Sequence, residues 1–198
     1  MPEIRPARKS DALVLAYLID LAGEGIPSYL WGQAAEFGET ALDVGSRRAE
    51  REQGAFSYRN AYVVEVDGRP VSMLLGYRQP DTFAAGDLEE FPPFIRPMVE
   101  LEAEAPGSWY VNALATLPEH QGRGYGAMLL DIAEQVAANT GATLLSIIVD
   151  SKNARAAELY RRSGYRERAR RRILALPGDR VDGDWVLLVR PVTRKAEE

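Results

Sequence analysis

Hydrophobic and polar positions follow a helical period near the start of the chain. Ser10 is a typical helix-start residue, and apolar side chains then recur at Val14, Leu18 and Leu21 until Gly23 interrupts the pattern. This spacing places the apolar side chains on one face of a helix, so we predict a first amphipathic helix here. Similar patterns predict further helices over residues 97–105, 123–139 and 153–162, and within residues 26–60.

Runs rich in β-branched and aromatic residues predict strands. Residues 61–66 and 71–75 flank Asp67-Gly68, a dipeptide typical of a tight turn, so they should pair as an antiparallel hairpin. The order strand, helix, strand between residues 109 and 149 predicts a parallel pair, because parallel strands need a long crossover. The fold class is therefore mixed α/β (α+β), with a central mixed sheet flanked by helices. Further strands are expected over residues 109–115, 143–149 and 185–189.

Composition narrows the possible partners and surroundings. No repeat or Pro/Gly-rich linker divides the 198 residues, so residues 1–198 should form a single domain. The net charge of −5 offers no positive field for nucleic acid. No apolar run approaches the roughly 20 residues that span a bilayer, and no signal peptide is visible, so we expect no membrane association. The absence of cysteine fits a reducing compartment, and we expect a cytoplasmic protein.

The most informative stretch is Gln-Gly-Arg-Gly-Tyr-Gly-Ala at residues 121–127, between a predicted strand and the helix that follows it. A helix start presents unpaired N–H groups and a positive dipole end, and glycines let phosphate oxygens approach them. A turn that binds nothing is an equally reasonable interpretation. The phosphate loop of nucleoside triphosphatases is excluded because the chain contains no Gly-Lys-Ser or Gly-Lys-Thr. The dinucleotide motif G-x-G-x-x-G fits poorly, although Asp150 after the next strand imitates its ribose-binding acid.

Three ordered segments resemble the GNAT acyltransferases. Gln121, Gly124 and Gly126 match the family motif Q/R-x-x-G-x-G/A at the start of its central helix. The strand at residues 109–115 precedes this motif, and Asn-Ala-Arg-Ala-Ala-Glu-Leu-Tyr at residues 153–160 follows it. The resemblance covers roughly residues 108–166. It implies a GNAT-like fold whose splayed parallel strands form an acetyl-CoA cleft, and an N-acetyltransferase (acyltransferase) function with acetyl-CoA as acetyl donor.

The resemblance also implies which groups bind the cofactor. The pyrophosphate of acetyl-CoA would lie on main-chain amides of the glycine turn, and the pantetheine arm would pair with the strand before it. An N–H of Leu114 or Ala115 would stabilise negative charge on the thioester oxygen. The implied cofactor-binding residues are Leu114, Ala115, Thr116, Gln121, Gly122, Arg123, Gly124, Tyr125, Gly126, Ala127 and Asn153.

Tyr160 matches the family position from which a phenol protonates the departing CoA thiolate, so the resemblance implies that it is the general acid. Alternatively, Tyr160 is a core aromatic on the buried face of its helix. Asn153 matches a position that contacts the cofactor arm, and it could equally cap the start of that helix.

The general base is not evident from the sequence. An alkylamine with a pKa near ~10 must lose a proton before or during attack. Asn112 stands where related enzymes carry a carboxylate, and an amide cannot act as a base. Glu119 and His120 beside the turn are typical of solvated surface. Glu100, Glu102 and Glu104 could attract a cationic acceptor, although charged helix faces are usually only solvated.

We therefore expect acetyl transfer by direct attack of an amine on the thioester, without a covalent enzyme intermediate or a metal ion. The acceptor, a small-molecule or peptide amine, is left open. The alternative is an acyl-CoA-binding or regulatory module without turnover. The arginine-rich run at residues 166–172 should be a strand exposing alternate arginines to water, although contact with an acidic partner or with a cofactor phosphate would also explain it. An exposed last strand at residues 185–189 would permit a homodimer.

Overall fold

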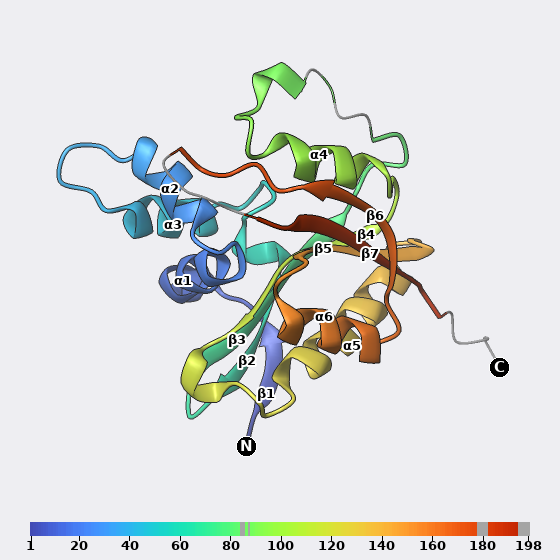
Figure 1. Cartoon of the computed structure of the whole chain (residues 1–198). Coiled ribbons are helices and arrows are strands. Elements are labelled where there is room, and N and C mark those ends of the chain that lie inside the picture. Colours follow the sequence, from blue (N-terminus) through green and yellow to red (C-terminus); the bar gives the residue numbers. More distant parts are fainter. Residues whose placement is uncertain (84–85, 87, 178–181, 194–198) are drawn as a thin grey trace. The chain divides into compact units, whose positions relative to one another are not determined.

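A computed structural model describes residues 1–83, 86, 88–177 and 182–193. The strands form one seven-stranded sheet in the order β1-β2-β3-β4-β5-β7-β6, which contains parallel and antiparallel pairs (Figure 1). The mixed sheet flanked by helices confirms the predicted fold class. The strands are β1 (Glu3–Pro6), β2 (Ala61–Val66), β3 (Arg69–Arg78), β4 (Trp109–Thr116), β5 (Leu144–Asp150), β6 (Arg166–Arg172) and β7 (Asp184–Pro191). The α-helices are α1 (Ala12–Ala22), α2 (Ile26–Gln33), α3 (Ala41–Ala49), α4 (Arg96–Ala103), α5 (Tyr125–Asn139) and α6 (Ala154–Arg162).

The chain divides into two compact units. The first contains Met1–Tyr77 and Asn112–Ile132, and the second contains Arg78–Val111 and the chain from Ala133 onward. Strand β4 and helix α5 each continue from one unit into the other. That residues 1–198 act as a single domain stays a prediction.

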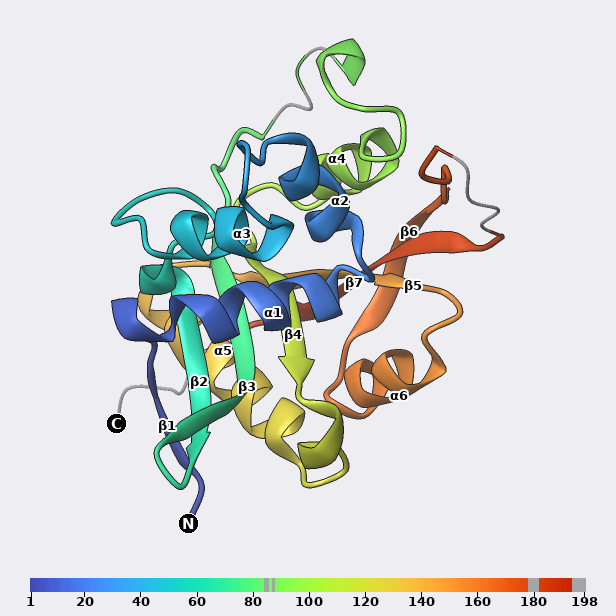
Figure 2. The same ribbon diagram turned by 90° about the vertical axis from the view of Figure 1, so that its left-hand side faces the viewer.

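The first unit is built on the antiparallel strands β1, β2 and β3. Helix α1 crosses one face of β2 and β3, with α3 beside it (Figure 2). Leu15 and Leu18 of α1, Trp31 of α2 and Val44 of α3 are buried in one apolar cluster with Met73 of β3. Successive side chains of a strand point to opposite faces of the sheet. The apolar side chains on one face of the strands therefore form the other side of this core.

The β2–β3 hairpin confirms the Asp-Gly turn signal. Asp67 and Gly68 both have positive φ, at 50° and 75°. Two successive residues with positive φ are the requirement of a type I′ turn, whose twist matches that of the paired strands. The hairpin therefore brings Ser72 of β3 to a defined register opposite Val64 of β2.

The second unit contains β5, β7 and β6, joined in antiparallel pairs, with α4 packed beside β6 and β7 (Figure 1). The first residues of β4 pair in parallel with β5, as the strand–helix–strand order predicts. The expectation of an exposed last strand is wrong. Strand β7 hydrogen-bonds to β5 on one side and to β6 on the other, so β6, and not β7, is the edge strand at this end of the sheet.

Within the described residues, no single helix is long and apolar enough to cross a membrane. Two helical segments, Lys9–Ala22 and Ile26–Gln33, reach the required length and composition only when taken together, and they are bent at 120°.

Candidate functional site

The glycine turn of the first unit opens helix α5. Gly122 and Gly124 have φ of 78° and 85°, a conformation that is strained for residues with a Cβ. The Met128 N–H donates to the Gly124 carbonyl at 3.1 Å, which makes Gly124 the residue that caps the helix start. The two left-handed glycines turn the chain from the short 3₁₀ segment Pro118–His120 into α5.

The N–H groups of the turn are unpaired. In the part of the chain that the structure describes, the main-chain N–H groups from Gly122 to Ala127 find no main-chain acceptor. Gly122, Arg123, Gly124 and Ala127 are exposed, whereas Tyr125 is buried. The Arg123 side chain turns back to the Glu119 carbonyl at 3.3 Å. Exposed donors without an acceptor at a helix N-terminus attract phosphate oxygens.

The end of β4 is held by side-chain hydrogen bonds. The buried Ser72 hydroxyl donates to the Ala115 carbonyl at 2.9 Å and lies 2.7 Å from the Thr116 hydroxyl. The Gln121 side-chain amide donates to the Thr116 carbonyl at 3.1 Å. These contacts tie β4 to β3 and to the glycine turn, so the strand end and the turn form one rigid corner within the first unit.

The pairing of β4 with β5 is short. Their parallel register covers Trp109, Tyr110 and Val111 of β4, while β4 continues to Thr116 and β5 continues to Asp150. Among the described residues, the second half of β4 therefore has no register with β5. Such a strand edge can accept an added extended chain, because its N–H and C=O groups remain in strand geometry.

Asn153 caps α6 in the second unit. Its side-chain oxygen accepts a hydrogen bond from the Ala156 N–H at 3.0 Å, which is the helix-start role considered from the sequence. The side chain is exposed, and its amide nitrogen is a separate donor group. Capping and a contact with a ligand are therefore compatible.

Tyr160 is the buried residue of α6, with 5% of its surface exposed. Burial raises the pKa of its phenol above the ordinary value of 10.0, and the neighbouring Tyr165 raises this pKa further. The two rings meet edge to face with centroids 5.9 Å apart. The Tyr165 N–H donates to the Tyr160 carbonyl at 3.0 Å, after Gly164 with φ of 86° ends the helix. The position of the Tyr160 phenol is therefore fixed by both the ring contact and the helix end.

Asn112 of β4 and Glu119 and His120 beside the turn are the residues that the sequence raised in the search for a base. The Asn112 amide donates to the Tyr77 hydroxyl at 3.4 Å. The Nδ1 atom of His120 is buried and has no partner among the described residues, while Glu119 is exposed. No group of three or more His, Asp or Glu side chains that could hold a metal ion occurs in the described part of the chain.

Glu102 of α4 is the unusual carboxyl group of the second unit, and sequence reasoning did not separate it from Glu100 and Glu104. The side chain is half-buried. Burial raises its pKa from 4.5 to about 7, and a hydrogen bond from the Tyr110 hydroxyl opposes part of that rise. Glu100 and Glu104 instead form ion pairs with Arg171 of β6, at 2.7 and 3.0 Å. A carboxyl with a pKa displaced by burial is a candidate functional group.

The raised pKa of Glu102 predicts a pH-dependent stability effect. Because the folded state binds the proton more tightly than the unfolded chain, Glu102 makes the protein less stable as pH rises from 4.5 to about 7. Glu102→Gln should remove this loss, so the variant should be more stable than the parent by about 1–3 kcal/mol at pH 8, and nearly equal to it at pH 4.5. Urea unfolding at both pH values measures the difference. Glu104→Gln is the control, because it removes an exposed carboxyl of the same helix; an equal gain from that variant would contradict the assignment.

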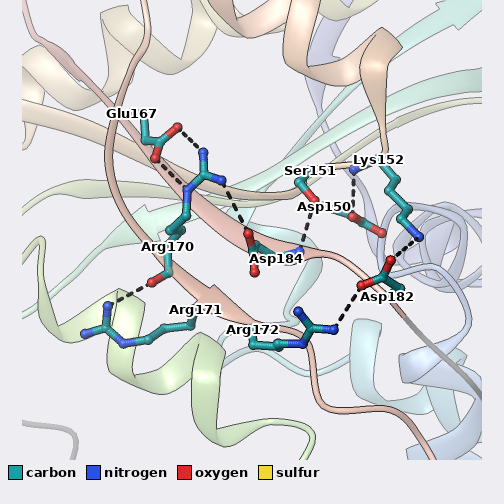
Figure 3. A network of polar contacts seen from close by, with 9 residues as sticks. All are labelled: Asp150, Ser151, Lys152, Glu167, Arg170, Arg171, Arg172, Asp182 and Asp184. Atoms are coloured by element: carbon teal, nitrogen blue, oxygen red, sulfur yellow. Dashed lines mark hydrogen bonds and ion pairs between the residues drawn. The ribbon is translucent and has the colours of Figure 1, made fainter.

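Several arginine side chains of strand β6 are paired with acidic side chains. Figure 3 shows Arg170 between Glu167 and Asp184, at 2.7 and 3.3 Å. Arg172 donates to Asp182 at 3.0 Å. Arg170 and Arg172 are exposed, as expected from the sequence, and they also pair with acidic side chains, which was the alternative. Their acidic partners come from the same strand, from β7 and from the segment before it.

Comparisons with known proteins agree with the fold of the sheet and its helices. Solved structures similar to the chain include an acetyltransferase (20% identity, 96% of this chain and 100% of that one, TM-score 0.68). They also include an N-acetyltransferase from Staphylococcus aureus Mu50 (18% identity, 95% of this chain and 100% of that one, TM-score 0.64). A third is the polyamine N-acetyltransferase of Drosophila melanogaster (16% identity, 96% of this chain and 100% of that one, TM-score 0.66). The chain has no significant match among curated protein sequences. Residues 27–165, well over half of the chain, match the acetyltransferase (GNAT) family, and the chain therefore belongs to this family of N-acetyltransferases.

Proposed function

We propose that the protein transfers an acetyl group from acetyl-CoA to an amine by direct attack of the amine on the thioester. The observation that carries this proposal is the row of main-chain N–H groups from Gly122 to Ala127, which have no main-chain acceptor among the described residues and most of which belong to exposed residues. The diphosphate of coenzyme A offers the oxygens that such a row binds, and the positive end of α5 adds to the attraction. Gln121 fixes the turn through Thr116.

The pantetheine arm is proposed to lie along the second half of β4. Its amide groups can pair with the main chain of Leu114, Ala115 and Thr116, where β4 has left its register with β5. An N–H of Leu114 or Ala115 then stabilises the oxyanion of the tetrahedral intermediate. Ser72 supports this step indirectly, because its hydroxyl holds the Ala115 carbonyl in place.

Tyr160 is the proposed general acid. The amine lone pair attacks the carbonyl carbon, the C–S bond breaks, and the sulfur leaves with the electron pair. The phenol of Tyr160 gives its proton to this thiolate and regains one from the nitrogen through solvent. Burial keeps the phenol protonated at neutral pH, so the donor is present throughout the working range. Asn153 is proposed to contact the cofactor arm through its amide nitrogen while its oxygen caps α6.

An acceptor screen tests this function. The protein should release CoA thiol from acetyl-CoA only when a suitable amine is present, and the rate of release should be proportional to the protein concentration. Because the chain contains no cysteine, every thiol detected by a thiol-reactive dye comes from CoA. Agmatine, spermidine and a peptide with an N-terminal alanine represent three of the acceptor types named for similar structures. Tight acetyl-CoA binding without acceptor-dependent thiol release, followed by mass spectrometry that finds no acetylated amine, would instead indicate a binding or regulatory module.

A further inference from the structure

Helix α1 of the first unit is apolar on both of its sides. Leu15 and Leu18 point into the core of that unit, where both are fully buried. Leu13, Tyr17 and Leu21 lie on the outer side and are 56%, 46% and 38% exposed. A surface helix normally turns polar side chains outward, so the outer side of α1 is expected to pack against another apolar surface.

Asp20 is the only charged residue of α1, and it makes a structural contact. Its carboxylate accepts a hydrogen bond from the Ser28 N–H at 2.7 Å, near the start of α2. The residue is half-buried. By its position on the helix, Asp20 lies beside the three exposed apolar side chains and does not separate them from one another. The apolar outer side of α1 is therefore continuous.

The three exposed side chains form a row, called here the α1 row (Leu13, Tyr17 and Leu21). Successive members are four residues apart, so each lies about 6 Å further along the helix and about 40° further around it. The row is Leu-Tyr-Leu in either direction. A second α1 packed antiparallel would therefore meet it with Tyr17 against Tyr17 and Leu13 against Leu21.

Charged residues at the two ends of the row favour this antiparallel arrangement. Lys9 is exposed and lies four residues before Leu13, whereas Glu24 is exposed and lies three residues after Leu21. In an antiparallel pair, Lys9 of one copy lies near Glu24 of the other, whereas a parallel pair would bring like charges together. The macrodipoles of two neighbouring helices also favour the antiparallel direction.

We propose that the α1 row is the interface of a symmetric homodimer, in which α1 of two copies packs antiparallel around a two-fold axis beside Tyr17. A two-fold interface brings one surface patch against the same patch of a second copy, and the α1 row is complementary to itself in residue pattern and in end charge. The Tyr17 ring supplies apolar area at the centre of the interface. This inference is independent of the proposed acetyl transfer.

The edge of the sheet at β6 is a less suitable surface for a second copy. Strand β6 has the sequence Arg-Glu-Arg-Ala-Arg-Arg-Arg. Antiparallel self-pairing of this strand would place arginines opposite arginines at most positions, which is destabilising. Strand β7 lies inside the sheet, between β5 and β6. The α1 row therefore accommodates a second copy better than either strand.

A membrane surface is also a less suitable occupant of the α1 row. Helices that lie on membranes usually carry Lys and Arg on the side that borders the headgroups, and α1 contains neither residue type. The chain as a whole has a net charge of −5, which anionic lipids repel.

Sedimentation velocity at micromolar concentrations tests the dimer. The parent protein should sediment with twice the mass of one chain. Tyr17→Glu should halve that mass, because two carboxylates would face each other at the axis without a counter-ion. Phe37→Glu is the matched control, because Phe37 is fully exposed outside the α1 row, and this variant should remain a dimer. Circular dichroism should show that both variants are folded.

Single cysteines test the antiparallel register, because the chain has no cysteine of its own. Under mild oxidation, Tyr17→Cys should form a disulfide between copies, since closely packed helices bring Cα atoms beside the axis within disulfide range. Leu13→Cys and Leu21→Cys should cross-link to each other when the two proteins are mixed, and far less when each is alone. Arg69→Cys, at an exposed position outside the α1 row, measures the background of random collisions.

Three results would overturn this assignment. The first is a parent protein that is monomeric at every concentration, and a monomer that co-sediments with phosphatidylcholine vesicles would assign the α1 row to lipid instead. The second is a dimer that persists in Tyr17→Glu. The third is cross-linking of Leu13→Cys alone as efficient as that of its mixture with Leu21→Cys. None of these results bears on acetyl transfer, which the acceptor screen tests separately.

Discussion

Tyr160→Phe should lower kcat by about 10²–10³-fold while leaving the KM for acetyl-CoA within a factor of about three. The variant keeps the ring and removes only the hydroxyl, so it loses the proposed proton donor to the CoA thiolate. Because burial raises the pKa of Tyr160, proton transfer to a thiolate with a pKa near ~8.5 is uphill, which places the effect in the lower part of the range for general acids. Steady-state kinetics on the best acceptor measures both parameters.

Tyr165→Phe is the matched control for Tyr160→Phe. Tyr165 packs edge to face on Tyr160 and is equally buried, and its hydroxyl has no partner among the described residues. Removing that hydroxyl should leave kcat unchanged and stability equal or slightly higher, since no hydrogen bond is lost. If Tyr160→Phe also keeps the parent kcat, Tyr160 is a core aromatic and the proton donor lies elsewhere.

Elements with strong local signals were predicted from the sequence. The hairpin followed from Asp67-Gly68, and α6 from Asn153 and Gly164, which occupy the cap positions that their residue types favour. The first helix formed where its apolar spacing predicted, although Leu21 of the predicted face is exposed. In each case the determining groups lie within a few residues of one another. Helix α3 carried a similar signal that was not used: Thr40 and Asp43 form a reciprocal capping box at its start.

Elements and contacts that depend on distant partners could not be predicted from local sequence signals. Strand β1 has four residues, and its conformation is explained by pairing with β2, some 60 positions away. The arginines of β6 looked like a solvated run because an acidic partner such as Glu100, 71 positions from Arg171, is not visible locally. Glu102 was not distinguished from its neighbours for the same reason. The sequence suggested one acidic face for α4, and only the fold separates Glu102 from Arg171 and places it against Tyr110.

Gly124→Ala should raise the dissociation constant of coenzyme A about 10- to 100-fold. The proposed diphosphate site needs the N–H groups at the start of α5 to keep their directions, and φ of 85° at Gly124 is costly for alanine by about 1–2 kcal/mol. Relaxing that strain would redirect the adjacent donors. Loss of one charge-assisted hydrogen bond, at about 1.5–3 kcal/mol, accounts for a change of this size. Isothermal titration with coenzyme A measures it without requiring an acceptor.

Gly141→Ala separates backbone strain from loss of the binding site. Gly141 follows the other end of α5, has φ of 77°, and, like Gly124, has no atom within 4 Å of an added Cβ. Both substitutions should therefore lower the free energy of unfolding by similar amounts, about 1–2 kcal/mol. Only Gly124→Ala should weaken coenzyme A, because only Gly124 adjoins the unpaired amides that end at Ala127. Equal affinities for coenzyme A in the two variants would mean that the diphosphate does not bind at this helix start.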